Sequence, residues 1–383
     1  MQTDRQAIIV GGGIGGLAAA IALSRRGWRV SVLERASRIT AAGSGLSIWP
    51  NGLRALDGLG VGEEVRSRAL VDTEGGIRDT RGRWLSKTDT DEMARRHGPL
   101  VAIHRADLLE ILQATLPPGV VHLGETVSEI AEDNGATTVA HTSGVSRADL
   151  VVGADGIHSM VRRALWPQAA APRYAGYTAW RTVVHPGTRP RSGGETWGSG
   201  EIFGIVPLGD GRIYVFAGAS TPEGQRSTDG ELAELHRRFD SWHDPIPALL
   251  DAAEPEAVLR HDIYHLPDLK SFVRQRVALL GDAAHAMTPN LGQGANQALE
   301  DAVTLAEVVD HAEPDLALAS YDRLRRPRTQ SLARQSRRMG SLAHLASPAA
   351  ALVRNTVMRL APARVALARL DPVLDWHAPR MTR

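Results

Sequence analysis

The sequence predicts an α/β protein, α+β overall, with a parallel βαβ domain, an inserted antiparallel sheet and a helical C-terminus. Residues 7–34 show the pattern of a strand, a glycine-rich turn, a helix and a second strand. Eight of the 17 aromatic side chains fall between Trp166 and Phe216, in strand patterns separated by turn residues. After residue 314 the pattern is helical and rich in arginine.

The composition is that of an ordinary globular protein. Of the 383 residues, 43% are apolar and 23% are charged, which argues against disorder and against a coiled coil. The formal net charge is only +1, so no global field favours nucleic acid. Because cysteine is absent, disulfides, thiolate metal sites and a cysteine nucleophile are excluded. No secretion signal or long apolar run is evident, so we expect a cytoplasmic protein without a membrane span.

The first half of the chain supplies most of the βαβ domain. An apolar run at residues 7–10 is broken by the glycines of 11–16. An Ala- and Leu-rich segment then continues to Gly27, which suits the C′ position of a helix. Residues 30–33 form the next strand. We also expect helices at 51–70 and 104–116, and short strands over 120–155.

The second half begins with the inserted sheet. Strands are expected at 177–184, 201–207 and 212–219, with 208–211 as a hairpin turn. Ordinary strand propensity and a pocket for a flat substrate both explain the aromatic enrichment there. The βαβ domain resumes with a buried strand at 276–281 and a helix at 294–309.

These elements define three predicted units. The βαβ domain is discontinuous, the sheet domain is inserted into it, and the last unit consists of helices. Their boundaries are 1–70, 98–170 and 275–330 for the first, 71–97 and 171–274 for the second, and 331–383 for the third. Residues 349–370 combine apolar residues with Arg354, Arg359, Arg364 and Arg369, which favours a packed cap or subunit contact over docking on an anionic membrane.

Residues 11–16 form a G-x-G-x-x-G pattern between a strand and a helix. Gly11 permits the tight turn, Gly13 lets the backbone approach a pyrophosphate, and Gly16 allows close helix–strand packing. The helix N-terminus offers free N–H groups and a positive dipole end. Glu34 ends the second strand ~20 residues later, where a carboxylate accepts hydrogen bonds from ribose hydroxyls. The pattern predicts a Rossmann-like dinucleotide site, for either NAD(P) or FAD.

Two later segments decide between these ligands. One contains Gly153-Ala-Asp155-Gly156 and the other begins with Gly281-Asp282. With the first motif, they resemble the three signatures of the single-component FAD-dependent aromatic hydroxylases, the p-hydroxybenzoate hydroxylase-like flavoprotein monooxygenases. The resemblance runs from residue 7 to about 330. The chain has no second strand–G-x-G-x-x-G–helix unit, which fits a family whose nicotinamide donor binds transiently in a shared cleft.

The third segment also has a physical interpretation. Asp282 follows a buried strand, where its carboxylate can accept a hydrogen bond from a ribityl or ribose hydroxyl. Pro289 makes the following loop rigid, and Gly292 and Gly294 let backbone N–H groups lie against a planar ring. The helix that follows directs its positive end at the same place and stabilises negative charge there. Asn296 suits either the ring edge or a helix cap.

The resemblance implies further cofactor contacts. Arg105 corresponds to an arginine that contacts the flavin phosphate or ribityl chain, and Val127 to the backbone beside adenine. The Asp155 segment serves both FAD and the nicotinamide donor, whereas Arg162 suits a structural ion pair equally well. The complete predicted cofactor set is Gly11, Gly13, Ile14, Gly15, Gly16, Glu34, Arg35, Gly45, Leu46, Arg105, Val127, Asp155, Gly281, Asp282, Pro289, Gly292, Gly294, Ala295 and Asn296. For the loop of Gly45 and Leu46, a plain surface turn is the alternative to a place near the ring.

The implied activity is hydroxylation of a small aromatic or heteroaromatic molecule. In the resembled family, non-covalent FAD is reduced by NADPH or NADH and traps O₂ as a flavin C4a-hydroperoxide, which passes one oxygen to the ring. We expect no metal, no nucleic-acid partner, and a monomer or homodimer. A flavin-dependent halogenase or reductase on the same fold, or a non-catalytic flavin redox sensor, is the alternative. The W-x-W-x-I-P segment of halogenases is not found in the sequence.

Substrate contacts are expected from the aromatic-rich sheet and the Pro289 loop. Tyr177, Arg181 and Tyr214 are the polar candidates, and Phe203 with the alternating Ile205 is expected to form an apolar wall.

The same strands give two further expectations. Alternation along the strand directs Trp180 away from Arg181. Urate-hydroxylating relatives use an arginine near the place where Ile202 and Phe203 stand, so urate is disfavoured as the substrate.

Overall fold

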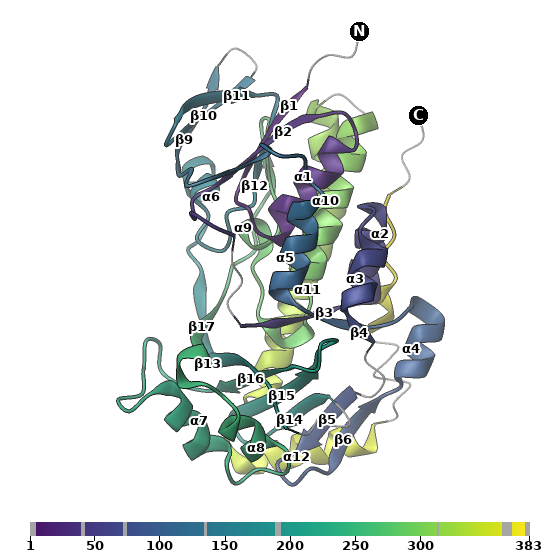
Figure 1. The fold of residues 1–383 in the computed structure, drawn as a ribbon, viewed down its shortest axis with the longest axis vertical. Coiled ribbons are helices and arrows are strands. Elements are labelled where there is room, and N and C mark those ends of the chain that lie inside the picture. The colour runs from purple at the N-terminus through teal and green to yellow at the C-terminus, as the bar shows by residue number, and fades with distance from the viewer. Residues whose placement is uncertain are drawn as a thin grey trace.

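The computed structural model describes residues 5–39, 43–71, 75–133, 136–187, 193–311, 314–361 and 370–379. Figure 1 shows two regions, one above the other: the upper contains β1, β2 and β12, and the lower contains β13 to β17. The helix α11 (Pro314–Ala343) joins them, since Tyr321 near its start donates to Leu279 O in the upper region and its end reaches the lower sheet. The predicted α/β class with a helical C-terminus is confirmed.

The upper region is built on a six-stranded sheet. Its neighbours pair in parallel except at one edge, where β18 runs antiparallel to β19. The strand order is β18 (Val273–Arg274), β19 (Val277–Leu279), β12 (Leu150–Gly153), β1 (Gln6–Val10), β2 (Arg29–Glu34) and β8 (Val121–Leu123). The central strands are buried on both faces, which explains their continuous apolar runs.

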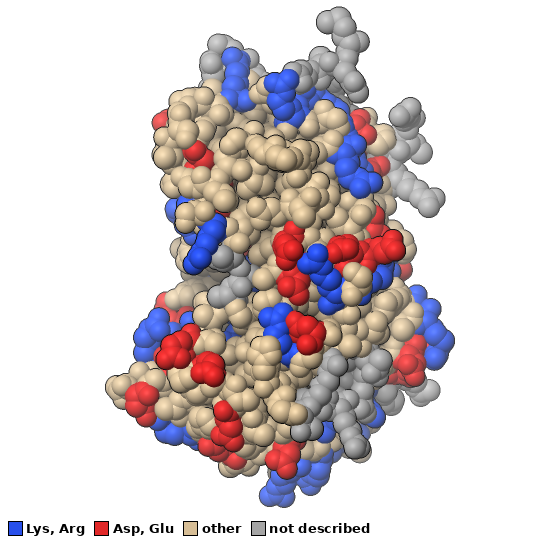
Figure 2. All heavy atoms as spheres, viewed as in Figure 1, with Lys and Arg blue, Asp and Glu red and all other residues tan. Residues whose placement is uncertain are grey.

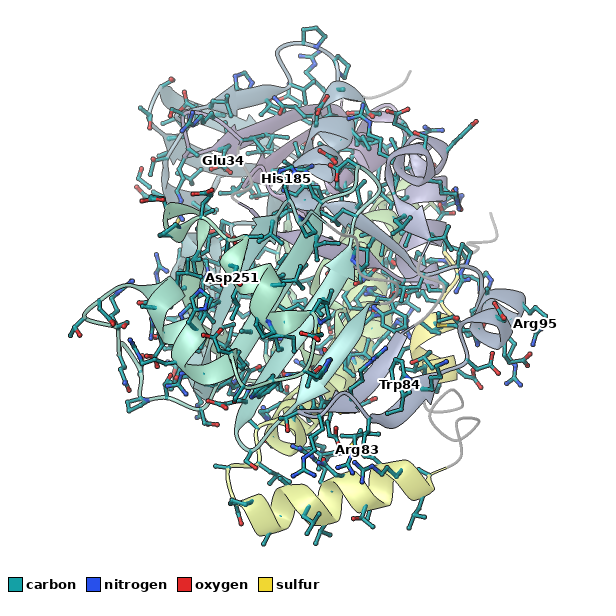
Figure 3. All side chains as sticks on the ribbon, turned by 60° about the horizontal axis from the view of Figure 1, so that its bottom comes forward. Glu34, Arg83, Trp84, Arg95, His185 and Asp251 are labelled. Atoms are coloured by element: carbon teal, nitrogen blue, oxygen red, sulfur yellow. The ribbon has the colours of Figure 1, made fainter. Side chains whose placement is uncertain are left out.

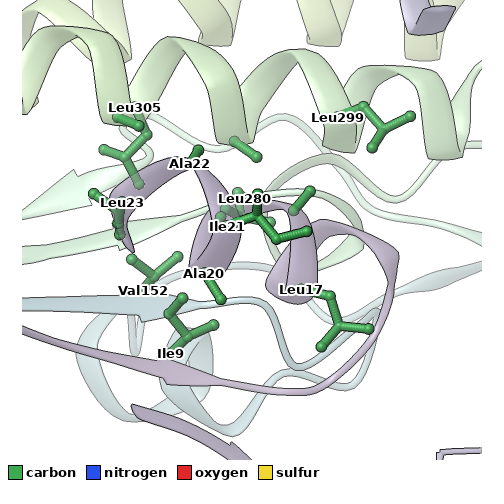
Figure 4. Packing of buried hydrophobic residues seen from close by; sticks show 14 of the residues in the cluster. Ile9, Leu17, Ala20, Ile21, Ala22, Leu23, Val152, Leu280, Leu299 and Leu305 are labelled. Carbon is green, nitrogen blue, oxygen red and sulfur yellow. The ribbon is translucent and has the colours of Figure 1, made fainter. Parts of the chain in front are cut away.

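The helix α1 (Ile14–Ser24) packs on this sheet in the centre of the core. Figure 4 shows Leu17, Ile21 and Leu23 between the strands of Ile9 and Val152 and the helix α10 (Gly294–His311). Four alanines of α1 are at most 1% exposed, and their small side chains let the two helices approach closely. Gly27 adopts a left-handed conformation (φ 78°) two residues after the C-cap, one position later than predicted.

Shorter elements surround this core. The predicted helix at 51–70 is two helices, because the chain turns at Gly60 (φ 76°). The helices are α2 (Pro50–Gly58), α3 (Gly62–Arg68), α4 (Thr90–His97), α5 (Arg105–Ala114), α6 (Met160–Leu165) and α9 (Asp282–His285). Two small antiparallel sheets have the orders β11 (Gly144–Ala148), β10 (Ala136–His141), β9 (Val127–Asp133) and β3 (Gly45–Ile48), β7 (Val101–His104), β4 (Leu70–Val71).

The lower region is a seven-stranded sheet. Its pairs are antiparallel except for β14 with β5, so a segment from the first quarter of the chain forms one edge. The order is β17 (Leu259–His265), β13 (Arg173–Val184), β16 (Ile213–Ala219), β15 (Glu201–Pro207), β14 (Gly194–Trp197), β5 (Gly75–Asp79) and β6 (Trp84–Thr88).

The two faces of the seven-stranded sheet have different neighbours. One face packs against α7 (Glu231–Phe239) and α8 (Ile246–Asp251) in an apolar cluster that includes Trp180, Phe203 and Ile205. We call this the outer face. The other carries Tyr177, Arg181 and Tyr214 and is approached by β3 and by the end of α11. We call this the inner face. Two 3₁₀ turns lie at Pro255–Ala257 and Pro289–Leu291.

The helix α12 (Pro348–Leu360) crosses the sheet edge formed by β5 and β6, close to Arg83 and Trp84 (Figure 3). Arg354 is 4% exposed and donates to Ala343 O and Gly198 O, each at 2.8 Å. Arg359 pairs with Asp79. Arg354 is buried and Arg359, although exposed, is directed at the sheet edge through Asp79, whereas the apolar Leu352, Val353, Val357 and Leu360 are exposed. Arg364 and Arg369 lie outside the described residues. The inward arginines agree with a packed cap.

The surface carries charges of both signs. On the face shown in Figure 2, Lys and Arg alternate with Asp and Glu. Around α3, for example, Arg66 pairs with Asp57 at 2.7 Å and Arg68 with Glu64 at 2.8 Å. Within the described ranges, no helix combines the length and apolarity needed to cross a bilayer.

A buried ionic cluster joins α10 to α11. Arg325 Nη1 lies 2.5 Å from Glu300 Oε2, and Arg325 Nε lies 2.6 Å from Asp301 Oδ1, with all three side chains at most 1% exposed. Arg328 adds a second guanidinium to Glu300 at 2.8 Å. Burial alone raises the pKa of Asp301, but His285 and Arg325 outweigh it and lower that pKa to about 2. Asp301 is therefore held as a carboxylate.

Replacing Arg325 with Ala is expected to lower the free energy of unfolding by about 3–5 kcal/mol, because it leaves two buried carboxylates without their main partner. Urea unfolding of the FAD-loaded protein measures this. The control is Arg334→Ala, which breaks the exposed pair with Asp268 and should cost less than about 1 kcal/mol. Equal losses for the two variants would contradict the expectation.

Candidate active site

The glycine loop between β1 and α1 has the geometry that the sequence predicts. Gly11 has φ 107°, and a Cβ there would lie 2.5 Å from Ala154 O. A Cβ on Gly16 would lie 1.9 Å from Gly11 O, so both positions need glycine for packing. Gly13 differs, because a Cβ there would enter open space at the start of α1, where no side chain caps the helix. The open position leaves the helix N–H groups available to an anionic ligand.

Glu34 lies at the end of β2 beside this loop and is labelled in Figure 3. Its Oε2 accepts from Gly12 N–H at 2.6 Å and its Oε1 accepts from Ala36 N–H at 2.8 Å. A carboxylate has about four acceptor positions, so each oxygen can accept one more hydrogen bond. Glu34 therefore shapes the glycine loop and can hold a diol at the same time. The neighbouring Arg35 is exposed.

Asp155 and Arg162 connect the second motif to the third. Asp155 Oδ2 accepts from Met160 N–H at 2.6 Å and Val161 N–H at 3.1 Å, and so caps α6. Arg162 is 3% exposed and donates to the carbonyls of Ala283, at 2.8 Å, and Ile157. The ion-pair role proposed for Arg162 is thus replaced by hydrogen bonds to backbone carbonyls. Asp155 Oδ1 is buried without a hydrogen-bond partner in the described part of the chain.

The buried Asp301 carboxylate fixes the turn of the third motif. Gly281, in a left-handed conformation (φ 57°), donates its N–H to Asp301 Oδ2 at 2.9 Å. His285 Nε2 lies 2.6 Å from the same oxygen. Asp282, between these two residues, is exposed at the start of α9. The buried carboxylate therefore fixes a turn that leaves the Asp282 carboxylate free for a ligand.

In the loop from Pro289 to Asn296, only one of the two glycines has open space beside it. A Cβ on Gly294 would meet no atom within 4 Å, whereas one on Gly292 (φ 60°) would lie 3.0 Å from Trp49 Nε1. Gly292 is thus needed for the backbone itself, and only Gly294 has open space beside it. Asn296 is fully buried, accepts from Trp49 N–H, and donates to Ser47 O and Gly292 O. The Asn296 side-chain amide thus forms its hydrogen bonds within the protein. Of its two predicted roles, this favours the structural one over contact with the ring edge.

The remaining predicted cofactor residues occupy three parts of the upper region. Ile14 and Gly15 are in the first turn of α1, and a Cβ on Gly15 would meet Leu280 at 2.7 Å. Gly45 and Leu46 begin β3, where Gly45 lies against the Tyr214 ring rather than in a surface turn. Val127 is 7% exposed at the start of β9, and Ala295 is half-buried in the first turn of α10.

Four polar side chains from four elements lie near enough for their charges to interact where the upper region faces the inner face. They are Arg105, Asp282, Arg181 and Tyr214. Burial lowers the pKa of Arg105, which Asp282 opposes and Arg181 reinforces. Burial raises the pKa of Tyr214, which Arg181 and Arg105 oppose. The predicted cofactor residues and the predicted substrate residues therefore share one electrostatic environment.

Tyr177 lies further along the inner face, beside the Pro289 loop. Its hydroxyl donates to Asn290 Oδ1 at 2.8 Å, and its ring stacks on His344 with centroids 4.0 Å apart. Burial lowers the pKa of His344 to about 4, so this ring is neutral at pH 7. A cavity of about 160 Å³ borders Tyr177, Thr288 and Arg337. The exposed Pro289 directly follows Thr288, so the loop and the inner face adjoin the same space.

The placement of Phe203 corrects one expectation. Phe203 is fully buried on the outer face and makes an edge contact with Phe239 of α7, with centroids 5.3 Å apart. Ile205 lies in the same outer cluster. Neither can form a wall of a pocket on the inner face, where alternation places Ile202 instead. Trp180 does point away from Arg181, since its Nε1 donates to Glu231 Oε2 of α7 at 2.7 Å.

The donor set of the upper region fits FAD. Open positions at Gly13 and Gly294 lie at the N-termini of α1 and α10. Asp282 offers an exposed carboxylate, and Asp155 has a buried oxygen without a partner in the described ranges. Anion-binding helix ends together with acceptors for hydroxyls match the pyrophosphate and the polyol parts of a dinucleotide.

Residues 4–336 match the family model described as "FAD binding domain". The chain belongs to the FAD-dependent aromatic monooxygenases. It is 38% identical to the aurachin C monooxygenase/isomerase of Stigmatella aurantiaca, over 94% of this chain and 95% of the relative. It is 36% identical to the 3-amino-4-hydroxybenzoate 2-monooxygenase of Streptomyces cremeus, over 89% and 88% of the two chains.

The family's solved structures have the same fold. Klebsiella pneumoniae HpxO in complex with FAD and uric acid superposes with a TM-score of 0.92 at 29% identity, covering 98% of this chain and 97% of that one. The predictions of an FAD cofactor and of monooxygenase activity are confirmed. The matches do not support the halogenase, reductase and redox-sensor alternatives.

Several site residues were not found by sequence reasoning. Asp301 and Arg325 are distant from the glycine motifs in sequence, and charged residues on a helix give no signal of burial. His344 lies beyond the motif region altogether.

Replacing Glu34 with Ala should raise the dissociation constant of FAD by about 10- to 150-fold, since a hydrogen bond to a charged group contributes about 1.5–3 kcal/mol. Titration of the apoprotein with FAD, followed by fluorescence, measures the change. The control is Glu129→Ala, on the exposed surface of β9, which should leave the affinity as it is. Unchanged affinity in Glu34→Ala would remove Glu34 from the site.

Replacing Gly294 with Val should weaken FAD binding or lower the hydroxylation rate per bound FAD by about 10²-fold or more, because the new methyl groups fill the space beside the helix N–H donors. The fold should survive, since nothing lies within 4 Å of the new Cβ. Gly187→Val makes the same change in another open loop position and is the matched control. A normal affinity and a normal rate per bound FAD in the Gly294 variant would show that this loop does not face the cofactor.

Proposed function

We propose that this monooxygenase uses NADH or NADPH and O₂ to hydroxylate a small aromatic or heteroaromatic molecule held against the inner face. The observation that supports this most directly is the proximity of Arg105 and Asp282 to Arg181 and Tyr214. Arg105 and Asp282 belong to the predicted cofactor loops. Arg181 is the arginine in the middle of β13 that lies on the inner face, so cofactor loops and inner face share one electrostatic environment.

The proposed arrangement assigns one part of the cofactor to each motif. Gly13 and the N-terminus of α1 receive the pyrophosphate, and Glu34 accepts from the ribose of the adenosine half. Asp282 and Arg105 hold the ribityl chain and a phosphate. The N-terminus of α10 at Gly294 stabilises negative charge on the reduced ring. When bound, FAD supplies the redox and oxygen-transfer chemistry.

The substrate half of the proposal rests on the inner face. Arg181 provides a fixed positive charge for an acidic or carbonyl oxygen of the ligand. Tyr214, kept in its phenol form by burial, can donate a hydrogen bond. Tyr177 is fixed by Asn290 and by the His344 ring, so it limits the pocket beside the Pro289 loop. These side chains orient the ring and keep water from the reacting edge.

The proposed domain division follows the sheets. Residues 1–70, 98–170 and 275–330 form the cofactor domain, and 71–97 with 171–274 form the substrate domain. The pairing of β5 with β14 supports this division, because it places residues 75–79 in the seven-stranded sheet. The chemistry then takes place between the two domains, with α11 contacting both.

The substrate proposal does not include urate. The two relatives with the higher identity described above are named for aurachin C and for 3-amino-4-hydroxybenzoate. On the inner face, the apolar Ile202 packs with Trp197 and Ala343, and the nearby Arg354 guanidinium is already engaged by the carbonyls of Ala343 and Gly198 and by the Trp197 ring. We therefore propose a more apolar aromatic ring than urate.

Oxidation of NADH or NADPH by the FAD-loaded protein should be slow alone and at least tenfold faster with a suitable aromatic compound. The substrate is needed to complete the inner-face pocket and to accept the oxygen, and without it reduced flavin yields hydrogen peroxide. The measurement is absorbance at 340 nm across a panel of phenols and N-heteroaromatics, with peroxide and hydroxylated product assayed together. A rate that no compound in the panel stimulates would contradict the proposed function.

A further inference from the structure

One row of residues crosses the inner face through four neighbouring strands. Arg181 of β13 pairs with Phe216 of β16, Phe216 pairs with Gly204 of β15, and Gly204 pairs with Glu195 of β14. Side chains that are directly opposite on neighbouring strands point to the same face. Strands lie about 4.8 Å apart, so the Cα atoms of Arg181 and Glu195 are separated by roughly 14 Å. A positive and an acidic side chain thus stand at the two ends of this row.

The middle of the row is a flat aromatic floor. A Cβ on Gly204 would lie 2.0 Å from Phe216 Cζ, so the phenyl ring extends sideways over the glycine toward Glu195. Any larger residue at position 204 would displace it. Phe216 also packs beside Trp197, which confirms that both rings are on the inner face.

Glu195 itself is held in place at the far end. Trp197, two residues along the strand and therefore on the same face, donates its Nε1–H to Glu195 Oε2 at 2.7 Å. Among the described residues, Trp197 is the only group that forms a hydrogen bond with the Glu195 carboxyl group, and no cation pairs with that carboxyl group. Burial raises the pKa of Glu195, and the carboxyl group lies close enough to Tyr177 to influence the pKa of that phenol. Glu195 therefore lies on the same face of the sheet as Tyr177, near enough for their charges to interact.

The row borders an accessible space. Arg181, Phe216 and Glu195 each keep part of their surface accessible, although they lie in inner strands of the sheet. On the outer face, the neighbouring Phe203, Val215 and Ala217 are all buried. The accessible surface of these strands is thus found above the row and not below it.

We propose that Glu195 selects the substrate by accepting a hydrogen bond from an N–H or O–H group of a flat one- or two-ring system that lies over Phe216 and presents an oxygen to Arg181 at its opposite edge. This inference rests on the proposed function and narrows its substrate class. A ring without a donor opposite its oxygen leaves the Glu195 carboxyl unpaired on binding, which carries a penalty.

The test compares ligands that differ only in this donor. Two pairs of probes are used: 4(1H)-quinolone with 1-methyl-4-quinolone, and 4-hydroxybenzoate with 4-methoxybenzoate. Dissociation constants come from the change in flavin absorbance of the FAD-loaded protein. In at least one pair the wild type should bind the donor-bearing member about tenfold or more tightly than its methylated analogue.

Glu195→Gln should reduce that preference to less than about threefold, while its FAD content stays that of the wild type. The carbonyl of Gln can still accept from Trp197, so the variant should fold. The matched control is Glu201→Gln, on the next strand but paired with Arg238 on the outer face, and it should keep the full preference. This ratio between two ligands does not respond to a general loss of stability.

Two results would overturn the inference. In one, the methylated analogues bind the wild type as well as the donors do, or neither pair binds at all. In the other, Glu195→Gln keeps the preference. Neither result touches the proposed function, which stands or falls on stimulated NAD(P)H oxidation by the wider aromatic panel.

Discussion

The contact of Arg325 with Glu300 and Asp301 determines the position of the third glycine motif. The Asp301 carboxylate contacts three groups at once, namely Arg325, His285 and the N–H of Gly281. A buried ion pair adds little net stability compared with well-packed apolar side chains of the same volume. The contribution of the Asp301 carboxylate here is to fix positions. An apolar residue has no atom that could form hydrogen bonds with both a backbone N–H group and an imidazole. The exposed Asp282 depends on that arrangement.

The helix α11, which carries Arg325, also contacts the Pro289 loop and the inner face. Ser336 donates to Thr288 O at 2.6 Å, and a Cβ on Gly340 would lie 2.6 Å from Asn290 Oδ1, so α11 passes directly along the Pro289 loop. Asn290 in turn accepts from Tyr177. The helix α11 thus contacts the turn of the third motif near its middle and approaches β13 near its end, where His344 stacks on Tyr177. The two halves of the site are therefore positioned by one element, with no need for a separate hinge between them.

Sequence reasoning succeeded where the signal is local. The strand–glycine–helix order, the acidic end of β2 and the two later motifs each occupy a short window, and their elements form as predicted. Sequence reasoning failed where the pairing of the strands determines the face on which a side chain lies. Phe203 and Ile202 are adjacent in sequence but lie on opposite faces, and only the strand pairing together with the packing of the sheet shows that Ile202 is on the inner face. Arg162 and Asn296 were ambiguous because their partners are more than a hundred residues away.

The two faces of the seven-stranded sheet differ in packing. The outer face is closed by Phe203, Phe239 and Trp242 in edge-to-face contacts that any change would disturb. The inner face instead presents polar groups around a single phenyl ring. In the proposed arrangement, a change at Arg181 or Glu195 alters which ligand edge is paired without disturbing a packed core. Under that proposal, stability and specificity depend on opposite sides of the same strands, and residues that alternate along β13, β15 and β16 differ in role as well as in direction.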